Sequence, residues 1–213
     1  MNDTVLVRGG ISLQPFSEED LPLILDHHSD PEVHRFLTGN ERAWDEQQAG
    51  MWLSRTLENQ ARHGFSTFKV LSRQQRFREA YPSGASRLDM AEGQAAENAA
   101  ALIRTGNGFL GWAGFVPIEE TSEIGLSYSF SRAALSLYPT IARDICQDLT
   151  EWFFENTYFS HLVASLRTDD KAGREVVTRL GFSYRESSRI DGRPCDLFQL
   201  LSPSMRSYVM MSA

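Results

Sequence analysis

Apolar and polar residues alternate in two stretches of the first half of the chain, and two helical patterns lie between these stretches. Residues 11–16 (ISLQPF) and 65–72 (FSTFKVLS) alternate as half-buried strands do. After the first stretch, Ser17 is a typical N-cap residue, and Asp20 stands where a capping box needs its acidic partner. A second helical pattern covers residues 44–63 and is followed by a glycine stop. The first half therefore predicts a strand, two helices and a strand.

The second half of the chain predicts five further strands and two further helices. The runs FLGWAGFVPI and EIGLSYSF are separated by turn-prone residues, as in a hairpin, and Asp191-Gly192 is a strong signal for a second hairpin. The helix after Pro139 has the clearest apolar face, and the last helix has a candidate cap at Asp170. The strands are expected at 109–118, 123–130, 161–166, 182–190 and 194–201, and the helices at 139–157 and 170–180.

Residues 73–105 interrupt this order and contain few large apolar side chains. The chain has 213 residues, whereas a typical domain has ~150, and one insertion into one domain explains the excess. We therefore expect a single domain over residues 1–213 with an insertion at about 73–105. A structureless loop of this length is uncommon in a compact domain. The segment is either a surface insertion without chemistry or a partly helical lid.

The composition is that of an ordinary globular protein, with 41% hydrophobic and 23% charged residues. A formal net charge of −7 argues against a general binder of nucleic acids or anionic membranes, and it favours a cationic or amine partner. No apolar run reaches the ~18 residues of a membrane span, and the first residues lack a signal-peptide pattern. We therefore expect a cytoplasmic protein with no membrane partner, either a monomer or a homodimer.

Neither the cysteines nor the histidines form a recognisable metal motif. Cys146 and Cys195 lie far apart in the sequence without a CxxC spacing, which indicates neither a disulfide framework nor a zinc site. His27 and His28 are adjacent and point to different faces of a helix, and no acidic or cysteine partner has a matching spacing. We expect no bound metal, and we interpret Cys146 as a small buried hydrophobic residue.

Several phrases of the sequence resemble the GNAT superfamily of acyl-CoA-dependent N-acetyltransferases. They are ISLQPFSEEDLPLILDHHSDPEVHRFL at the start, GFLGWAGFVPI and EIGLSYSF in the middle, and HLVASLRTDDKAGREVVTRLGFSYRE toward the end. Within the superfamily, the chain looks most like the RimJ/RimL-type ribosomal-protein N-terminal acetyltransferases. The resemblance implies an α+β fold, in which about four helices flank a mixed sheet of six to seven strands. It also implies that the sheet splays between its fourth and fifth strands, here 123–130 and 161–166, and that acetyl-CoA lies in the opening.

The implied reaction is direct transfer of the acetyl group of acetyl-CoA to a primary amine, which is a peptide N-terminus or a small molecule. The resemblance places the pyrophosphate at the helix after the fourth strand, where unpaired N–H groups and the helix dipole favour an anion. The residues expected to bind the co-substrate are Phe130, Ser131, Arg132, Tyr138, Thr140, Ile141, Ala142 and Arg143, with Asp170 and Arg174 at the last helix.

The chain departs from the family pattern within this expected site. The segment 131–142 contains no glycine, although the family's pyrophosphate loop usually has two. Asp170 replaces the usual asparagine, and Gly173 stands where a hydroxyl residue is expected. These departures keep a second function open, namely a GNAT fold without catalysis that binds an altered ligand or a partner.

A few side chains are candidates for the chemistry and for acceptor binding. An amine must lose a proton to attack, and the resemblance places Glu123 near it as the proton acceptor. The hydroxyl of Tyr128, or that of Tyr138, would protonate the departing thiolate, and Trp44 and Trp52 would line the acceptor side. Each has an ordinary alternative: a solvated carboxylate at a hairpin end, a packed tyrosine ring, or a tryptophan in the core.

Overall fold

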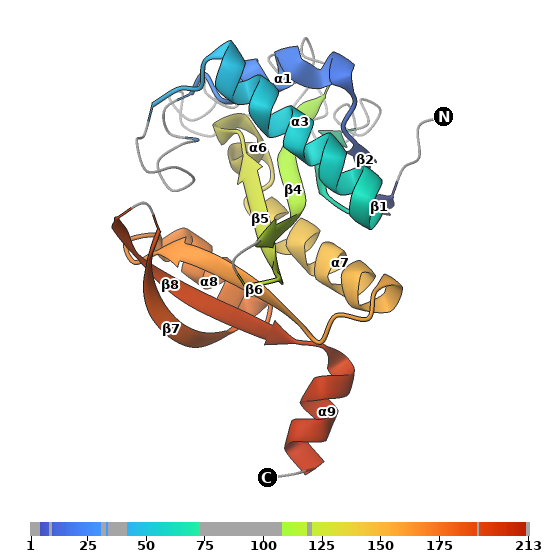
Figure 1. Cartoon of the computed structure of the whole chain (residues 1–213). Helices are drawn as coiled ribbons and strands as arrows, with labels where there is room; N and C mark the ends of the chain where they lie inside the picture. Colours follow the sequence, from blue (N-terminus) through green and yellow to red (C-terminus); the bar gives the residue numbers. More distant parts are fainter. Residues whose placement is uncertain are drawn as a thin grey trace, which may run out of the picture.

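Figure 1 shows the computed structural model, which describes residues 5–8, 10–30, 33, 42–72, 108–118, 121–190 and 192–211. The insertion expected at residues 73–105 lies outside the described residues. In the described part of the chain, every helix is too short or too polar to span a bilayer.

Eight strands form one mixed sheet in the order β1-β2-β3-β4-β5-β6-β8-β7. All neighbouring strands are antiparallel except β5 and β6, which are parallel. The α+β fold with a mixed sheet is as expected, but the expected number of six to seven strands is too low. The strands are β1 (Leu6–Arg8), β2 (Ile11–Pro15), β3 (Thr67–Ser72), β4 (Phe109–Ile118), β5 (Glu123–Phe130), β6 (His161–Arg167), β7 (Ser183–Ile190) and β8 (Arg193–Leu201).

The predicted capping box after β2 is confirmed. The backbone N–H of Ser17 donates to the carboxylate of Asp20 at 2.7 Å, and a 3-10 turn, η1 (Glu18–Asp20), leads into helix α1 (Leu21–His27). The same carboxylate accepts hydrogen bonds of 2.7 and 2.9 Å from Lys69 Nζ in β3. One acidic residue therefore both starts the helical segment and fixes it to the sheet.

Helix α3 (Glu46–His63) begins two residues later than expected and ends as predicted at a left-handed glycine, Gly64. The later start has a clear cause, because Asp45 is the N-cap and accepts the backbone N–H of Gln48 at 2.8 Å. Trp44 therefore precedes the helix instead of belonging to it.

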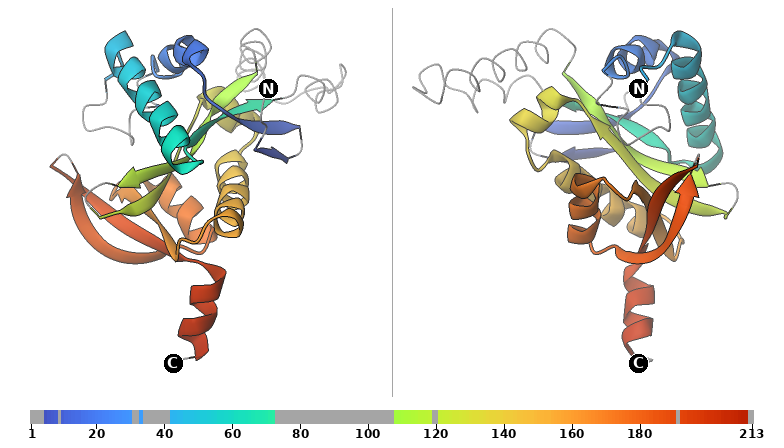
Figure 2. Two further views of the ribbon diagram at one scale, coloured as in Figure 1. Left: turned by 45° about the vertical axis from the view of Figure 1, so that its right-hand side comes forward. Right: turned by 90° about the vertical axis from the view of Figure 1, so that its left-hand side faces the viewer.

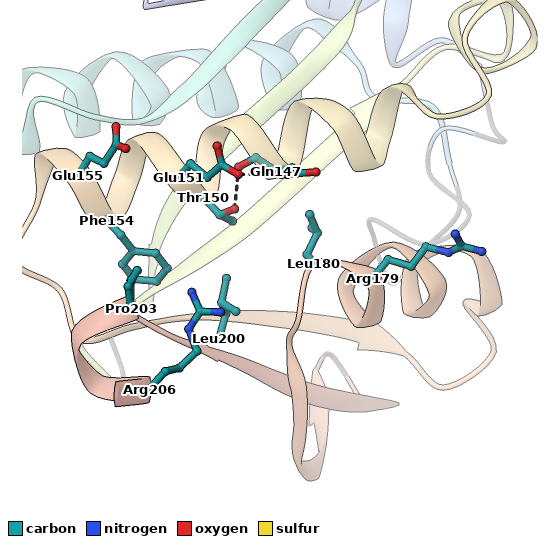
Figure 3. Close-up of a pocket in the computed structure, with 10 residues that line it drawn as sticks. All are labelled: Gln147, Thr150, Glu151, Phe154, Glu155, Arg179, Leu180, Leu200, Pro203 and Arg206. Atoms are coloured by element: carbon teal, nitrogen blue, oxygen red, sulfur yellow. Dashed lines mark hydrogen bonds between the residues drawn. The ribbon is translucent and has the colours of Figure 1, made fainter. Parts of the chain in front are cut away.

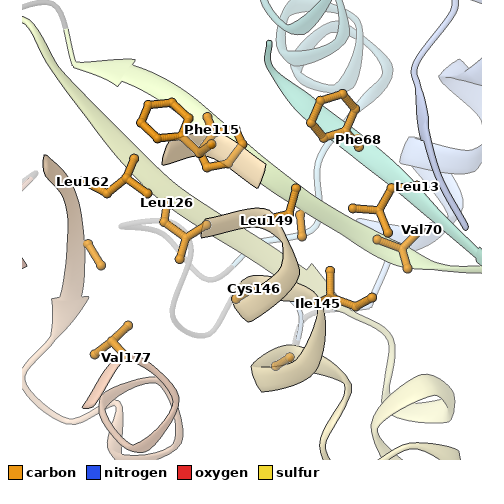
Figure 4. Close-up of a cluster of buried hydrophobic side chains, with 14 of the residues drawn as sticks. Leu13, Phe68, Val70, Phe115, Leu126, Ile145, Cys146, Leu149, Leu162 and Val177 are labelled. Carbon is orange, nitrogen blue, oxygen red and sulfur yellow. The ribbon is translucent and has the colours of Figure 1, made fainter. Parts of the chain in front are cut away.

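The helices lie on both faces of the sheet (Figure 2), with α1 and α3 on one face and α7 (Ile141–Asn156) on the other. The predicted apolar face of α7 is confirmed, since Ile141, Ile145, Leu149 and Phe153 are all buried. Figure 4 shows Ile145 and Leu149 directed at Leu126 and Val70 of the sheet. Helix α8 (Lys171–Arg179) packs beside α7 and against β6.

The expectation of about four helices omitted α6 (Arg132–Leu137) and α9 (Pro203–Met211). The resemblance implies a pyrophosphate loop within residues 131–142, and residues 131–138 belong to that segment. They instead form a short helix, because Ser131 acts as an N-cap and its Oγ accepts the N–H of Ala134 at 3.1 Å. A six-residue helix is too short to show a helical period, and β1, with three residues, is too short to show alternation.

Gly111 in β4 lies so close to β5 that a side chain does not fit. Its φ angle is +142°, and an added Cβ would lie 2.1 Å from the carbonyl oxygen of Ser129 and 2.8 Å from the Cα of Phe130. Both are backbone atoms, which cannot move away without disturbing the pairing of β4 with β5. This glycine therefore allows the close approach of the strand that borders the opening described below.

We expect Gly111→Ala to lower the free energy of unfolding by about 2–6 kcal/mol, because backbone strain and overpacking each cost about 1–3 kcal/mol. Urea unfolding followed by circular dichroism measures the change. Gly50→Ala is the matched control, since Gly50 lies inside α3 and an added Cβ meets nothing within 4 Å. This control should raise the free energy of unfolding by about 0.5–1 kcal/mol. Equal effects of the two changes would contradict the tight packing assigned to Gly111.

Candidate functional site

The sheet opens between β5 and β6. These parallel strands share a single register pair, Gly125 with Val163, whereas β4 and β5 are paired along the whole length of β5. The pair lies near the start of both strands, and beyond it β5 and β6 diverge toward Phe130 and Arg167 (Figure 1). Ligands of open sheets bind in such crevices beyond the carboxyl ends of parallel strands. The opening is therefore the candidate site.

The N-terminus of α7 follows β5 and α6 and provides backbone donors. The N–H of Ile141 donates to the carbonyl of Tyr138 at 2.9 Å. Among the described residues, no hydrogen-bond acceptor is found for the N–H groups of Ala142 and Arg143. The side chains of Ile141 and Ala142 are buried, so these residues offer only their backbone to a ligand. Unpaired N–H groups and the helix dipole favour an anion at this position.

A carboxylate lies at the same helix end. Asp144 in the first turn of α7 accepts hydrogen bonds from Thr140 Oγ1 at 2.6 Å and from Arg143 Nε and Nη2 at 3.0 and 2.9 Å. Burial acts to raise the pKa of Asp144, but the hydrogen bonds from Thr140 and Arg143 outweigh it and lower the pKa below its usual value. The carboxylate is therefore ionised and opposes an anionic ligand, while the Arg143 guanidinium compensates for it.

The other residues expected around the pyrophosphate have local partners. Phe130 is buried in the core and Ser131 caps α6. Arg132 is exposed, and its Nε lies 3.6 Å from the carboxylate of Asp30. Tyr138 is half-buried at the end of α6, between that helix and α7. The structure thus brings Tyr138, Thr140 and Arg143 together at one helix end, and it assigns packing and capping contacts to Phe130 and Ser131.

The two departures at α8 explain each other. The buried carboxylate of Asp170 caps α8 and accepts the backbone N–H of Gly173 at 2.8 Å. A Cβ at position 173 would lie 2.3 Å from Asp170 Oδ2, so this cap geometry requires a glycine there. Burial raises the pKa of Asp170. Arg174 pairs with the carboxylate of Asp196 and stacks over the Phe198 ring at 5.2 Å, and these contacts fix its guanidinium.

Tyr128 is half-buried on the α7 face of β5. Burial is the main cause that raises the pKa of its hydroxyl far above the usual value, and the charges of Cys146 in α7 and Asp170 at α8 act in the same direction. The phenol therefore lies near Cys146 and Asp170, and it packs against the core that α7 shares with the sheet. The hydroxyl remains protonated and is a hydrogen-bond donor. Cys146 is buried, as predicted.

Glu123 begins β5 on the opposite face, because side chains alternate along a strand. Its Oε1 is hydrogen-bonded at 2.9 Å to Nε2 of His161, which lies at the start of β6. The same oxygen accepts a hydrogen bond from Nη1 of Arg185 in β7. The hydrogen bond from Arg185 is the main cause that lowers the pKa of Glu123 to about 2, against the opposing effect of burial, and His161 adds to it. A carboxylate of such low basicity attracts a cation better than it removes a proton at neutral pH.

The acceptor-side tryptophans belong to an aromatic cluster under α1 and α3. The ring of Trp44 stacks on that of His28 at 3.8 Å between centroids, and the rings of Trp52 and Trp112 are 5.3 Å apart. Trp112 Nε1 also donates to His28 Nε2 at 3.1 Å. Both predicted tryptophans are half-buried, so each combines core packing with a remaining exposed edge.

Sequence reasoning missed three residues of the site, namely His161, Arg185 and Asp144. His161 and Arg185 contact Glu123 across 38 and 62 residues of sequence, and no local pattern marks such a contact. Asp144 carried a usable signal, since acidic residues are common in the first turn of a helix. In the described part of the chain, no group of three or more His, Cys, Asp or Glu side chains is arranged to hold a metal.

Comparisons with known proteins agree with this geometry. Residues 11–183 match the sequence family described as the acetyltransferase (GNAT) domain, and no curated protein matches the chain. An acetyltransferase from Agrobacterium tumefaciens is similar in structure, with a TM-score of 0.61, 15% identity and 92% of each chain covered.

Two further solved structures were determined with ligands. RimL, a ribosomal L7/L12 alpha-N-protein acetyltransferase in complex with coenzyme A, has a TM-score of 0.64 and 12% identity, over 93% of this chain and 98% of its own. The spermidine N-acetyltransferase from Vibrio cholerae, in complex with CoA and spermine, has a TM-score of 0.63 and 8% identity, over 93% and 99%. At sequence identities of 12% and 8%, the structural similarity shows a shared fold.

The low pKa of Glu123 predicts how stability depends on pH. The pKa of about 2 lies below the ordinary value of 4.5, so the ionised carboxylate stabilises the fold above about pH 5, and this contribution is lost as the pH falls toward 2. The loss should be about 3 kcal/mol, because a difference of one between two pKa values corresponds to about 1.36 kcal/mol. We expect wild type to be more stable than Glu123→Gln at pH 7, with a difference that shrinks toward pH 2 in urea unfolding.

Glu186→Gln is the matched control, because Glu186 also pairs with Arg185 but its side chain is 57% exposed. Its stability should follow that of wild type at every pH. Parallel profiles for wild type and Glu123→Gln would show that Glu123 does not hold the strands together.

Proposed function

Since the chain belongs to the GNAT acetyltransferase family, we propose that it transfers an acetyl group from acetyl-CoA to a primary amine. The observation that carries the proposal is the opening between β5 and β6, with the unpaired N–H groups of α7 at one end. The family match is consistent with this reaction. The named activities of RimL and of spermidine N-acetyltransferase suggest a peptide N-terminus or a small amine as acceptor.

The helix end supports binding of the pyrophosphate of acetyl-CoA. We assign the backbone N–H groups of Ala142 and Arg143 as donors to the phosphate oxygens, and the Arg143 guanidinium as a neighbouring cation. Asp144 opposes this binding, because its carboxylate is ionised at the same helix end. The proposed site therefore fits the co-substrate, at an affinity lowered by one fixed negative charge.

The proposed reaction forms a C–N bond and breaks a C–S bond. The neutral amine nitrogen attacks the thioester carbonyl carbon, the thiolate departs, and the amine loses one proton to solvent. We assign to Tyr128 a hydrogen bond to the departing sulfur, since its raised pKa keeps the hydroxyl protonated and solvent supplies the thiol proton. Glu123 is proposed to orient the amine as a hydrogen-bond acceptor and not to remove its proton, because its pKa is low and Arg185 already compensates its charge.

A second candidate function is a binding module without catalysis. The observation in its favour is Asp144, an ionised carboxylate at the helix end where an anionic co-substrate has to bind. In this case the opening would take an uncharged or cationic ligand instead.

An acetylation assay separates the two functions. The full chain is incubated with acetyl-CoA and a panel of peptides with free N-termini, spermidine and spermine, and thiol release is measured together with the mass of the acceptor. We expect release that depends on a free amine and an acceptor mass increased by one acetyl group. Peptides with blocked N-termini and no lysine are the control. Binding of acetyl-CoA without release on any amine would favour the binding module.

Removing the negative charge at α7 should strengthen acetyl-CoA binding. Because a charge near a helix end contributes about 0.3–1 kcal/mol, Asp144→Asn should lower the dissociation constant by about two- to fivefold at low salt. Glu155→Gln is the control, since Glu155 lies in the last turn of the same helix. An unchanged or weaker affinity for Asp144→Asn, measured by calorimetry, would place the pyrophosphate elsewhere.

The proposed role of Tyr128 predicts a change in kcat. Tyr128→Phe should lower kcat by about 10- to 100-fold, as expected for the loss of one positioned donor, and leave KM for acetyl-CoA within about twofold. Tyr138→Phe is the matched control, since it removes the other candidate hydroxyl and should alter kcat less. Wild-type kcat in Tyr128→Phe would exclude this role.

A further inference from the structure

An exposed hydroxyl, an imidazole and a carboxylate are hydrogen-bonded in a row at the start of β6. Ser160 Oγ lies 3.0 Å from Nδ1 of His161, and Nε2 of the same ring lies 2.9 Å from Oε1 of Glu123. Ser160 is exposed, whereas the side chain of Glu123 is only 13% exposed. The same order of groups activates the nucleophilic serine of hydrolases on unrelated folds, where geometry identifies it and sequence position does not.

The carboxylate decides which ring nitrogen of His161 carries the proton. The hydrogen bond from Arg185 lowers the pKa of Glu123 to about 2, so the carboxylate is ionised at neutral pH and only accepts hydrogen bonds. Nε2 of His161 therefore donates to it, and in the neutral ring Nδ1 keeps its lone pair. Ser160 Oγ then donates its proton to Nδ1. The hydroxyl thus faces a base in the tautomer that can take its proton.

Two other hydroxyl groups show why this combination matters. Thr150 Oγ1, at the wall of a groove between α7, α8 and β8, donates to the carbonyl of Gln147 at 2.8 Å (Figure 3). A carbonyl oxygen accepts a hydrogen bond but does not remove a proton at neutral pH. Ser129 Oγ is hydrogen-bonded to a ring nitrogen, Nε2 of His27, at 2.8 Å, but both residues are buried. Ser160 combines a basic partner with access from solvent.

The sheet holds the backbone around this hydroxyl. The carbonyl of Ser160 accepts the N–H of Ser202 at 2.8 Å, and His161 is paired with Leu201 of β8. The reacting oxygen and its base are therefore positioned by a strand. Among the described residues, no acceptor is found for the N–H of Ser160. In serine hydrolases the N–H of the nucleophilic residue helps to bind the oxyanion, so this donor suits the same task.

The side chains that precede Ser160 indicate the kind of substrate. Tyr158 is fully exposed, and Phe159 is 39% exposed. The Phe159 ring packs on Phe65 and Phe153, with centroids 6.0 and 5.4 Å apart, so it is fixed in place while part of it meets solvent. Exposed aromatic side chains next to the hydroxyl favour contact with an apolar group. The site therefore suits an uncharged ester with an apolar or aromatic part.

We propose that Ser160 is a second reactive site of this chain, a nucleophile toward activated, uncharged carboxylic esters. Its Oγ attacks the ester carbonyl carbon while His161 Nδ1 takes the hydroxyl proton. The bond from that carbon to the alkoxy oxygen then breaks, and the imidazolium returns the proton to the leaving alcohol. The products are an acylated Ser160 and one free alcohol. Glu123 is a positioning residue that holds the ring and gains no proton.

This reaction needs no acetyl-CoA. The row of groups lies at the start of β5 and β6, whereas α7, which is proposed to bind the pyrophosphate, follows the end of β5. Glu123 takes part in both proposals, so the main experiment changes Ser160 and His161.

Release of nitrophenolate from p-nitrophenyl acetate by the full chain tests this proposal in the absence of acetyl-CoA. Ser160→Ala and His161→Gln should each slow the release about 100-fold, since a positioned base contributes about 10²–10⁴-fold. His161→Gln keeps a donor for Glu123, so the fold should be retained. Mass spectrometry after an acid quench within the first turnover should place one acetyl group on Ser160.

The pH profile of the release separates a positioning role of Glu123 from a purely structural one. Release by wild type should rise with pH, because only the neutral imidazole takes the proton. Glu123→Gln removes a charge that stabilises the imidazolium, so it should displace this rise to lower pH. An unchanged pH profile in Glu123→Gln would contradict the role assigned to the carboxylate.

Ser188→Ala is the matched control, since Ser188 is another exposed serine, in β7. It should release nitrophenolate at the wild-type rate. The proposal is overturned by a wild type that is no faster than Ser160→Ala, by a wild-type rate in His161→Gln, or by an acetyl group found only on other residues.

Discussion

One backbone pair joins the two halves of this sheet. Within the described residues, β1 to β5 and β6 to β8 are joined in the sheet only where Gly125 meets Val163. Glu123 reinforces the junction, because its carboxylate binds His161 in β6 and Arg185 in β7. Strands β5 and β6 are joined near their first residues and are not paired beyond Gly125 and Val163. The candidate site depends on this difference between the two ends of the strands. Tyr128 lies in β5 beyond the paired residues, near Cys146 of α7 and the cap residue Asp170 of α8.

The side of the opening that is proposed to bind the co-substrate combines the family's fold with local departures in sequence. Where the resemblance implies a glycine-containing loop, the chain forms a capped helix, α6, whose backbone needs no left-handed residues. At α8, Asp170 and Gly173 form one unit, in which the glycine makes room for the carboxylate of the cap. At α7, Arg143 compensates for the charge of Asp144. Each departure thus has a local physical cause, and binding of an anion then depends on the backbone donors of α7.

Local signals in the sequence predicted most of the fold. The strand-like runs at residues 109–118 and 123–130 match the bounds of β4 and β5, because turn-prone residues separate two runs of strand length. Short elements such as β1 and α6 carried too few residues for a period to appear. The site was predicted only as a region. The charge state of Glu123 depends on Arg185, 62 residues away, and no spacing within one element encodes that contact.

Calorimetric titration of the full chain with acetyl-CoA tests the central claim most directly. We expect saturable binding of one molecule per chain, with an affinity that falls as salt rises. The reason is that Arg143 and the N–H groups of α7 that have no acceptor among the described residues meet a polyanion. Absence of binding at millimolar acetyl-CoA and low salt would contradict it. In that case Asp144 would determine the function of this helix end, and the opening would serve a different ligand.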